Sequence, residues 1–108
     1  MWKPIRGPVQ DWPLCICHPD SVDPSDLHPG DLVYDDYVIE NMQLHYADGQ
    51  KWYYLSEQSA DEAWVFIQSD SETKVFRVGV PHSAFALPAS MDHVMPRESI
   101  EVRCLVYV

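Results

Sequence analysis

Proline is concentrated at the start of this chain, where it limits regular secondary structure more than any other feature of the sequence. Six of the nine prolines lie within the first 31 residues: Pro4, Pro8, Pro13, Pro19, Pro24 and Pro29. Because proline lacks a backbone N–H and fixes φ, neither a long helix nor a central strand can run through this segment. We therefore predict a Pro-rich N-terminal segment of turns, including two within residues 21–31 (Ser-Val-Asp-Pro and His-Pro-Gly-Asp), interrupted by a small buried strand at Leu14-Cys15-Ile16-Cys17.

The following residues form short apolar runs separated by turn signals. Residues 32–34 and 37–39 are predicted strand pieces on either side of Asp35-Asp36. Apolar and polar residues then alternate over residues 42–46, which indicates a half-buried strand. The turn at residues 47–50 contains Asp-Gly, which supplies the positive φ of a hairpin, so residues 51–55 are expected to pair back as its second arm.

The second half of the chain continues this pattern with one helical exception. Ser59 stands ahead of Asp61-Glu62 in the spacing of a helix cap, which predicts one short helix. Strands are expected at residues 64–67 and 74–80, and a long strand at residues 100–108. Short strands with frequent turn signals are typical of an all-β sandwich or barrel.

Size and charge restrict the number of domains and the kinds of partner. With 108 residues, 46% of them hydrophobic, the chain suits a single domain spanning residues 1–108. Its 7 basic and 17 acidic residues give a net charge of −10, which disfavours binding to nucleic acid or anionic membranes. Because the chain has no apolar signal sequence and an odd number of cysteines, three, we expect a cytoplasmic protein with reduced thiols.

Several segments resemble one fungal family of secondary metabolism, the hydroxylase/desaturase group related to cephem methoxylases and gibberellin desaturases. They are Trp2-Lys3-Pro4-Ile5, Val9-Gln10-Asp11-Trp12-Pro13-Leu14, Lys51-Trp52-Tyr53-Tyr54-Leu55, Asp61-Glu62 with Val65-Phe66, Pro81-His82-Ser83-Ala84-Phe85 and Pro96-Arg97-Glu98-Ser99-Ile100-Glu101-Val102-Arg103. The similarity covers essentially the whole chain. It implies a partial double-stranded β-helix, which is jelly-roll-like, with iron(II) and 2-oxoglutarate as cofactors and a small secondary metabolite as substrate.

The resemblance also implies that only part of the family's fold is represented. Family members are considerably longer, and their His-x-Asp motif is expected upstream of the segment that begins at Trp2. We therefore predict a short or truncated oxidoreductase that resembles the C-terminal part of a longer oxygenase. Hydroxylation and desaturation both remain open.

His82 is the predicted metal ligand. Non-haem iron oxygenases bind the metal through two histidines and one carboxylate, leaving positions open for 2-oxoglutarate and oxygen. His82 follows the alternating run at residues 74–80, so we expect it at the mouth of a strand. The residues alone favour a loop histidine packed beside Phe85, whereas the resemblance favours a ligand.

Arg97 and Ser99 are the predicted co-substrate anchor. They share one face of the final strand because side chains alternate with a period of two. A guanidinium and a hydroxyl can together hold the distal carboxylate of 2-oxoglutarate. Arg103 shares that face, but six residues at about 3.3 Å each place it roughly 20 Å away. We therefore choose Arg97; the alternative is a surface Arg97 with a structural Glu101–Arg103 pair.

A literal His-x-Asp motif occurs at His18-Pro19-Asp20, 64 residues before His82. It lies among prolines and turns, and the resemblance does not align it with the family's motif. The sequence leaves open whether this motif replaces the missing ligands. The adjoining Cys15-x-Cys17-His18 lacks the usual spacing and second ligand pair of a zinc site, so both cysteines are predicted to pack within a strand.

Two groups of apolar residues are predicted to form the core. The first is an aromatic cluster, part of which could line a substrate pocket in an intact relative: Trp52, Tyr53, Tyr54, Trp64 and Phe66. The second is one face of the final strand: Ile100, Val102, Cys104 and Val106.

A non-catalytic β-sandwich is the competing hypothesis. Such a chain would keep the sheet without the metal and pair with a longer homologue or with itself. Missing strands would leave an open sheet edge and an uncovered apolar face, so we expect the isolated chain to associate or to be poorly soluble.

Overall fold

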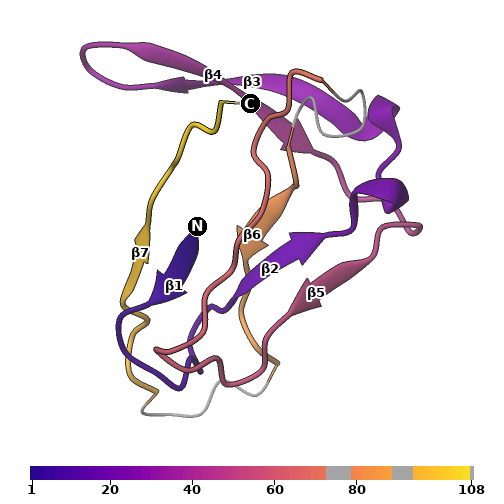
Figure 1. Ribbon diagram of the computed structural model, residues 1–108. Helices are drawn as coiled ribbons and strands as arrows, with labels where there is room; N and C mark the ends of the chain where they lie inside the picture. The colour runs from indigo at the N-terminus through magenta and orange to yellow at the C-terminus, as the bar shows by residue number, and fades with distance from the viewer. Residues whose placement is uncertain (73–78, 89–93, 108) are drawn as a thin grey trace.

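The computed structural model describes residues 1–72, 79–88 and 94–107, and these residues form short antiparallel strands with almost no helix (Figure 1). The elements are β1 (Trp2–Pro4), β2 (Leu14–Cys17), η1 (Pro19–Ser21), η2 (Pro24–Asp26), β3 (Leu27–Val33), β4 (Val38–Leu44), β5 (Trp52–Tyr54), β6 (His82–Ala84) and β7 (Ser99–Glu101). Each of the two 3-10 helices begins at a proline, whose fixed φ suits the first helical position. The predicted all-β class is confirmed.

Three separate sheets make up this arrangement. β2 is the central strand of a three-stranded sheet in the order β5-β2-β6, and β1 pairs with β7. The predicted strand at residues 14–17 is confirmed, and it is largely buried because it has a neighbour on each side. The predicted strand at residues 74–80 falls mostly outside the described residues.

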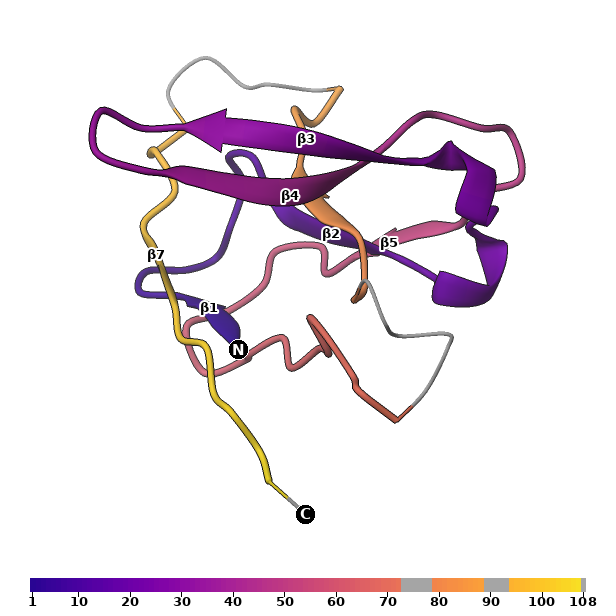
Figure 2. The same cartoon turned by 90° about the horizontal axis from the view of Figure 1, so that it is seen from above.

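β3 and β4 form a long hairpin that projects from the rest of the molecule and crosses over the β5-β2-β6 sheet (Figure 2). Its tip lies at Asp35-Asp36, between the two predicted strand pieces. The Tyr34 N–H donates to the Tyr37 carbonyl at 2.9 Å across these two aspartates. The turn predicted at residues 28–31 is wrong, because this stretch lies inside β3. Proline is tolerated there because β3 pairs on one side only.

The hairpin predicted from residues 42–46 to 51–55 is also wrong. The turn itself forms, with the Gln50 N–H donating to the Ala47 carbonyl at 3.2 Å. However, β4 pairs with β3, and β5 pairs with β2. The pairing of β5 is therefore determined by a strand distant in sequence rather than by the strand that precedes it along the chain.

Three further elements differ from the sequence-based expectation. The stretch at residues 59–62 is a turn, in which the Ser59 N–H donates to Glu62 Oε2 at 2.8 Å as in a capping box, but no helix follows. The segment at residues 64–67 contributes a single bridge, between Trp64 and Trp2. The final strand ends at Glu101 instead of continuing to the C-terminus.

The buried interior of the described residues is small. Its apolar members are Trp2, Val9, Leu14, Cys15, Cys17 and Val80, together with the fully buried Pro4. The aromatic cluster predicted as core is largely at the surface, where Trp52, Tyr53 and Tyr54 are 40–52% exposed. The stripe predicted on the last strand is exposed as well, because no element of the described chain covers residues 100–107. Both core predictions are therefore wrong for these residues.

Candidate functional site

His82 is the first residue of β6, opposite Ile16 of β2. Its Nδ1 lies 2.9 Å from the Val80 carbonyl oxygen, and its ring centroid is 4.7 Å from that of Phe66. A carbonyl can only accept, so Nδ1 carries the proton and Nε2 is left with a lone pair. Metal-binding histidines commonly have this second-nitrogen contact, which fixes the tautomer and the ring orientation. His82 is exposed and opens β6, whereas the sequence led us to expect it after the end of a strand at residues 74–80.

The His18-Pro19-Asp20 motif begins where β2 ends, at the same end of the sheet as His82. The Cys17 N–H donates to the Pro81 carbonyl at 2.8 Å, so the residues next to His18 and His82 are hydrogen-bonded neighbours. Nevertheless, the described ranges contain no group of three or more His, Cys, Asp or Glu side chains that could hold one metal ion. In this part of the chain His82 is a single candidate ligand, and it does not complete an iron site.

Arg97 lies just before β7 and is half-buried. Its Nη1 donates to the carbonyl of Trp12, its Cζ is 5.5 Å from the centroid of the Trp2 ring, and its backbone N–H donates to Asp11 Oδ2 at 3.1 Å. Trp12 has a φ of +41°, which is uncommon for a residue with a side chain. Arg97 therefore stabilises the local structure, because it bonds to the strained backbone at Trp12.

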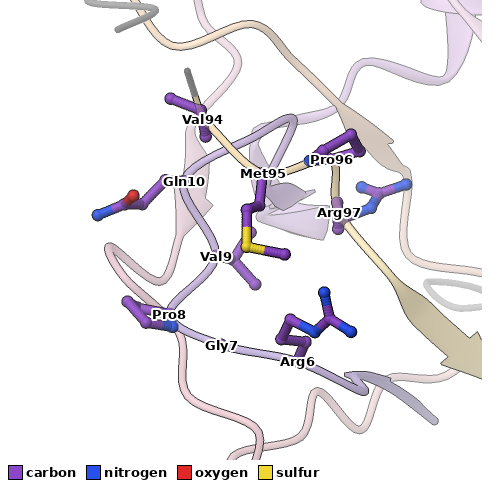
Figure 3. Close-up of a pocket in the computed structure, with 9 residues that line it drawn as sticks. All are labelled: Arg6, Gly7, Pro8, Val9, Gln10, Val94, Met95, Pro96 and Arg97. Carbon is purple, nitrogen blue, oxygen red and sulfur yellow. The ribbon is translucent and has the colours of Figure 1, made fainter. Parts of the chain in front are cut away.

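A pocket with a volume of about 190 Å³ adjoins Arg97. Its lining residues are Arg6, Gly7, Pro8, Val9, Gln10, Val94, Met95, Pro96 and Arg97. Arg6 and Arg97 lie on one side of it, Pro8 and Gln10 on the other, and Val9 and Met95 between them (Figure 3). Two arginines and several apolar side chains line the pocket, a combination that suits a small anion with an aliphatic body. The sequence-based reasoning missed Arg6; its place just after the Trp-Lys-Pro-Ile segment was the available signal.

The three predicted site residues do not share one sheet, and Arg97 lies outside the strands. Ser99 is half-buried in β7 opposite Pro4, whereas His82 belongs to β6. His82 pairs with Ile16 inside β2, whereas the Arg97 side chain contacts Trp12, which precedes β2. Among the described residues, no hydrogen bond or ion pair joins His82 to Arg97 or Ser99.

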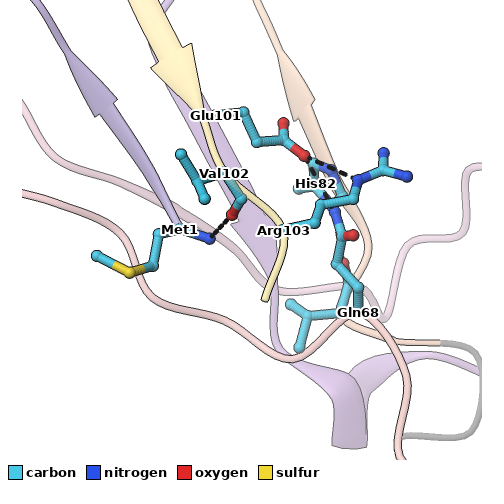
Figure 4. A network of polar contacts seen from close by, with 7 residues as sticks. Met1, Gln68, His82, Glu101, Val102 and Arg103 are labelled. Carbon is cyan, nitrogen blue, oxygen red and sulfur yellow. Dashed lines mark hydrogen bonds and ion pairs between the residues drawn. The ribbon is translucent and has the colours of Figure 1, made fainter. Parts of the chain in front are cut away.

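The Glu101–Arg103 pair considered from the sequence is present. Arg103 Nε is 3.3 Å from Glu101 Oε1, to which Gln68 Nε2 also donates at 3.4 Å (Figure 4). The Arg103 side chain is 78% exposed, so the pair contributes little to stability.

Cys15 and Cys17 are buried in β2, in agreement with the prediction that they pack within a strand. The Cys15 thiol donates to the Ser83 carbonyl at 3.3 Å, and burial raises the pKa of this thiol. Cys104 was predicted to pack in the core and is instead exposed, because the strand that was to bury it ends before it.

Comparison with known proteins decides the family. A family model described as an oxidoreductase/YMDC permease-like domain matches residues 1–107. The chain belongs to this family. The Fe(II)/2-oxoglutarate-dependent dioxygenase nvfI of Aspergillus novofumigatus is 42% identical over 99% of this chain and 39% of its own length. The hydroxylase/desaturase asaB of Aspergillus flavus is 31% identical over 99% of this chain and 53% of its own length.

Solved structures agree with this family assignment. A variant of the iron and alpha-ketoglutarate-dependent endoperoxidase NvfI matches with a TM-score of 0.79 and 36% identity, over 91% of this chain and 37% of that one. The resemblance to fungal oxygenases and hydroxylase/desaturases is thereby confirmed over the full length of the chain. The chain spans between 39% and 53% of the length of these two relatives. Within the described part, the model contains no helix long and apolar enough to span a membrane.

Proposed function

We propose that the chain supplies the C-terminal part of an iron(II)/2-oxoglutarate-dependent oxygenase that hydroxylates or desaturates a small secondary metabolite. Its sheets then belong to a partial double-stranded β-helix, and the three free cysteines suit a cytoplasmic setting. The observation that carries the proposal is the family match over residues 1–107, to which a solved iron and alpha-ketoglutarate-dependent enzyme adds a TM-score of 0.79.

In this proposal His82 is one of the iron ligands. The Nδ1 contact with the Val80 carbonyl leaves Nε2 as the coordinating atom, and the exposed position at the start of β6 gives a metal access to it. The described residues fit iron only in part, because they contain no group of three or more His, Cys, Asp or Glu side chains that could hold one metal ion. The remaining ligands would come from elsewhere in a complete enzyme, where iron supplies the oxidising chemistry.

Arg97 and Ser99 are proposed to hold the distal carboxylate of 2-oxoglutarate. Four residues separate Trp12, which contacts Arg97, from Ile16, which is opposite His82. Arg97 and Ser99 would hold the carboxylate toward the start of β2, and His82 would hold iron toward its end.

Titration of the purified chain with Co(II) and 2-oxoglutarate tests this function. Visible absorption of Co(II) reports imidazole coordination, and the signal should appear in the wild type and disappear in His82→Ala. His45→Ala is the matched control, because His45 is an exposed histidine whose ring is tilted against that of His28, with the ring centroids 4.2 Å apart, and it should retain the wild-type signal. A Co(II) signal that persists in His82→Ala contradicts the assignment of His82 as a metal ligand.

A non-catalytic partner of a longer homologue is the second candidate function. It is favoured by the apolar hairpin, where Val33, Tyr37 and Val38 are 55–76% exposed. Monomeric soluble proteins rarely leave such a patch uncovered. Sedimentation of the chain mixed with full-length nvfI of Aspergillus novofumigatus checks this candidate: a stable heterocomplex supports it, and independent sedimentation contradicts it.

A further inference from the structure

Arg6 is the second arginine that lines the pocket, together with Arg97. We propose that Arg6 is a further binding residue for the distal carboxylate of 2-oxoglutarate, and that the Glu98 carboxylate competes with this ligand for Arg6. The inference rests on the proposed function and adds Arg6 and Glu98 to it.

The charge distribution makes this pocket unusual for the protein. The chain carries seven basic residues against seventeen acidic ones, yet two of its arginines line one small pocket. A small anion is repelled by most of the surface and attracted here. Two carboxylates also lie at this site: Asp11, which accepts the backbone N–H of Arg97, and Glu98, which faces Arg6.

The contact between Arg6 and Glu98 is weak enough to be exchanged. Arg6 Nη1 is 3.5 Å from Glu98 Oε1, and the two side chains are 55% and 51% exposed. Ion pairs of this length and exposure contribute little to stability. A carboxylate ligand that also contacts Arg97 gains from two guanidinium groups, so it can displace Glu98 from Arg6.

The walls of the pocket are held by the backbone rather than by this ion pair. The Ile5 N–H donates to the Glu98 carbonyl at 2.9 Å, and the Val9 N–H donates to the Gln58 carbonyl at 3.0 Å. Gly7 lies so close to the neighbouring loop that an added Cβ would meet Gln58 O at 2.9 Å. Substitutions that remove the charged group of Arg6 or of Glu98 should therefore change the binding of 2-oxoglutarate without changing the fold.

The test measures the affinity of the purified chain for 2-oxoglutarate, by calorimetry or ligand-observed NMR, with and without Co(II). Arg6→Gln should weaken binding about three- to fivefold, whereas Glu98→Gln should tighten it about twofold. Arg6→Lys keeps the charge and should retain most of the affinity. Thermal unfolding of each variant confirms that it is folded, and raising the salt concentration should reduce the differences.

We expect Arg6→Gln and Glu98→Gln to change the affinity for 2-oxoglutarate in opposite directions. If the ion pair were merely structural, both substitutions would change this affinity in the same direction. If Arg97→Gln abolishes binding while Arg6→Gln and Glu98→Gln leave it unchanged, this inference is overturned and the proposed function stands. If the wild type does not bind 2-oxoglutarate under either condition, both are overturned.

Discussion

The Arg97 guanidinium lies over the indole ring of Trp2, with its Cζ 5.5 Å from the ring centroid. Trp2 is one of the few buried side chains of the described residues, only 5% exposed, so the cation sits directly against the small core. The same guanidinium donates to the Trp12 carbonyl. Arg97 thus ties β1, the turn at Trp12 and the approach to β7 together, in addition to its proposed role with the co-substrate.

Replacement of Arg97 by glutamine should destabilise the protein even without any ligand. Loss of the contact with Trp2 and of the bond to the Trp12 carbonyl is expected to lower the free energy of unfolding by about 1–2 kcal/mol. Urea denaturation of the wild type and Arg97→Gln measures the difference. Arg103→Gln is the control, since its side chain is 78% exposed, and it should change stability by less than about 0.5 kcal/mol. Equal stability of wild type and Arg97→Gln would show that these contacts contribute nothing.

The isolated chain should self-associate through its exposed apolar surface. Val33 and Val38 are cross-strand partners near the tip of the hairpin and are 76% and 58% exposed. Lysine at both positions should shift sedimentation toward the monomer, because it places charge on the apolar face and next to the unpaired strand edges. Ser56→Lys, at an exposed polar position, should leave association unchanged. A wild type that sediments as one monomeric species and melts cooperatively would disprove this prediction.

The free energy of unfolding should decrease at alkaline pH because of Cys15. Burial raises the pKa of this thiol in the folded chain above its value in the unfolded chain. The unfolded chain therefore releases the proton first, so the contribution is fully present below about pH 8.5 and is lost as the pH rises through the higher folded value.

Urea denaturation at several pH values between about 7 and about 10 measures how the free energy of unfolding changes with pH. This range brackets the ordinary pKa of a thiol. Cys15→Ala should flatten the decrease, whatever it does to the absolute stability, and Cys104→Ala should keep the wild-type slope because Cys104 is exposed. A Cys15→Ala variant with the wild-type slope would assign the pH dependence to other groups.

Local patterns predicted those parts of the fold that depend on neighbouring residues. The β3–β4 tip around Asp35-Asp36 and the strand at residues 14–17 followed from turn chemistry and apolar runs. The pairing of β5 with β2 did not, because ladder partners 39 positions apart in the sequence, such as Cys15 and Tyr54, leave no local signal. Burial failed for a similar reason: apolar residues at positions 100–107 have no covering element among the described residues.

The candidate site was predictable only through resemblance. Periodicity placed Arg97 and Ser99 on one strand face and His82 at the mouth of the strand predicted at residues 74–80, and the resemblance gave these residues their roles. Whether His82 and Arg97 serve one ligand is still a prediction. Arg6 escaped notice because its approach to the residues before β7 arises from the β1–β7 pairing, which the sequence does not reveal.

The linkage between metal and co-substrate tests the central proposal most directly. The affinity for 2-oxoglutarate is measured by calorimetry with and without saturating Co(II), in the wild type and in His82→Ala. If His82 binds the metal and Arg97 anchors the same diacid, Co(II) should tighten binding of 2-oxoglutarate at least about tenfold, and His82→Ala should abolish that gain while retaining the weaker metal-free affinity. An affinity for 2-oxoglutarate that is the same with and without Co(II) in the wild type would contradict the account.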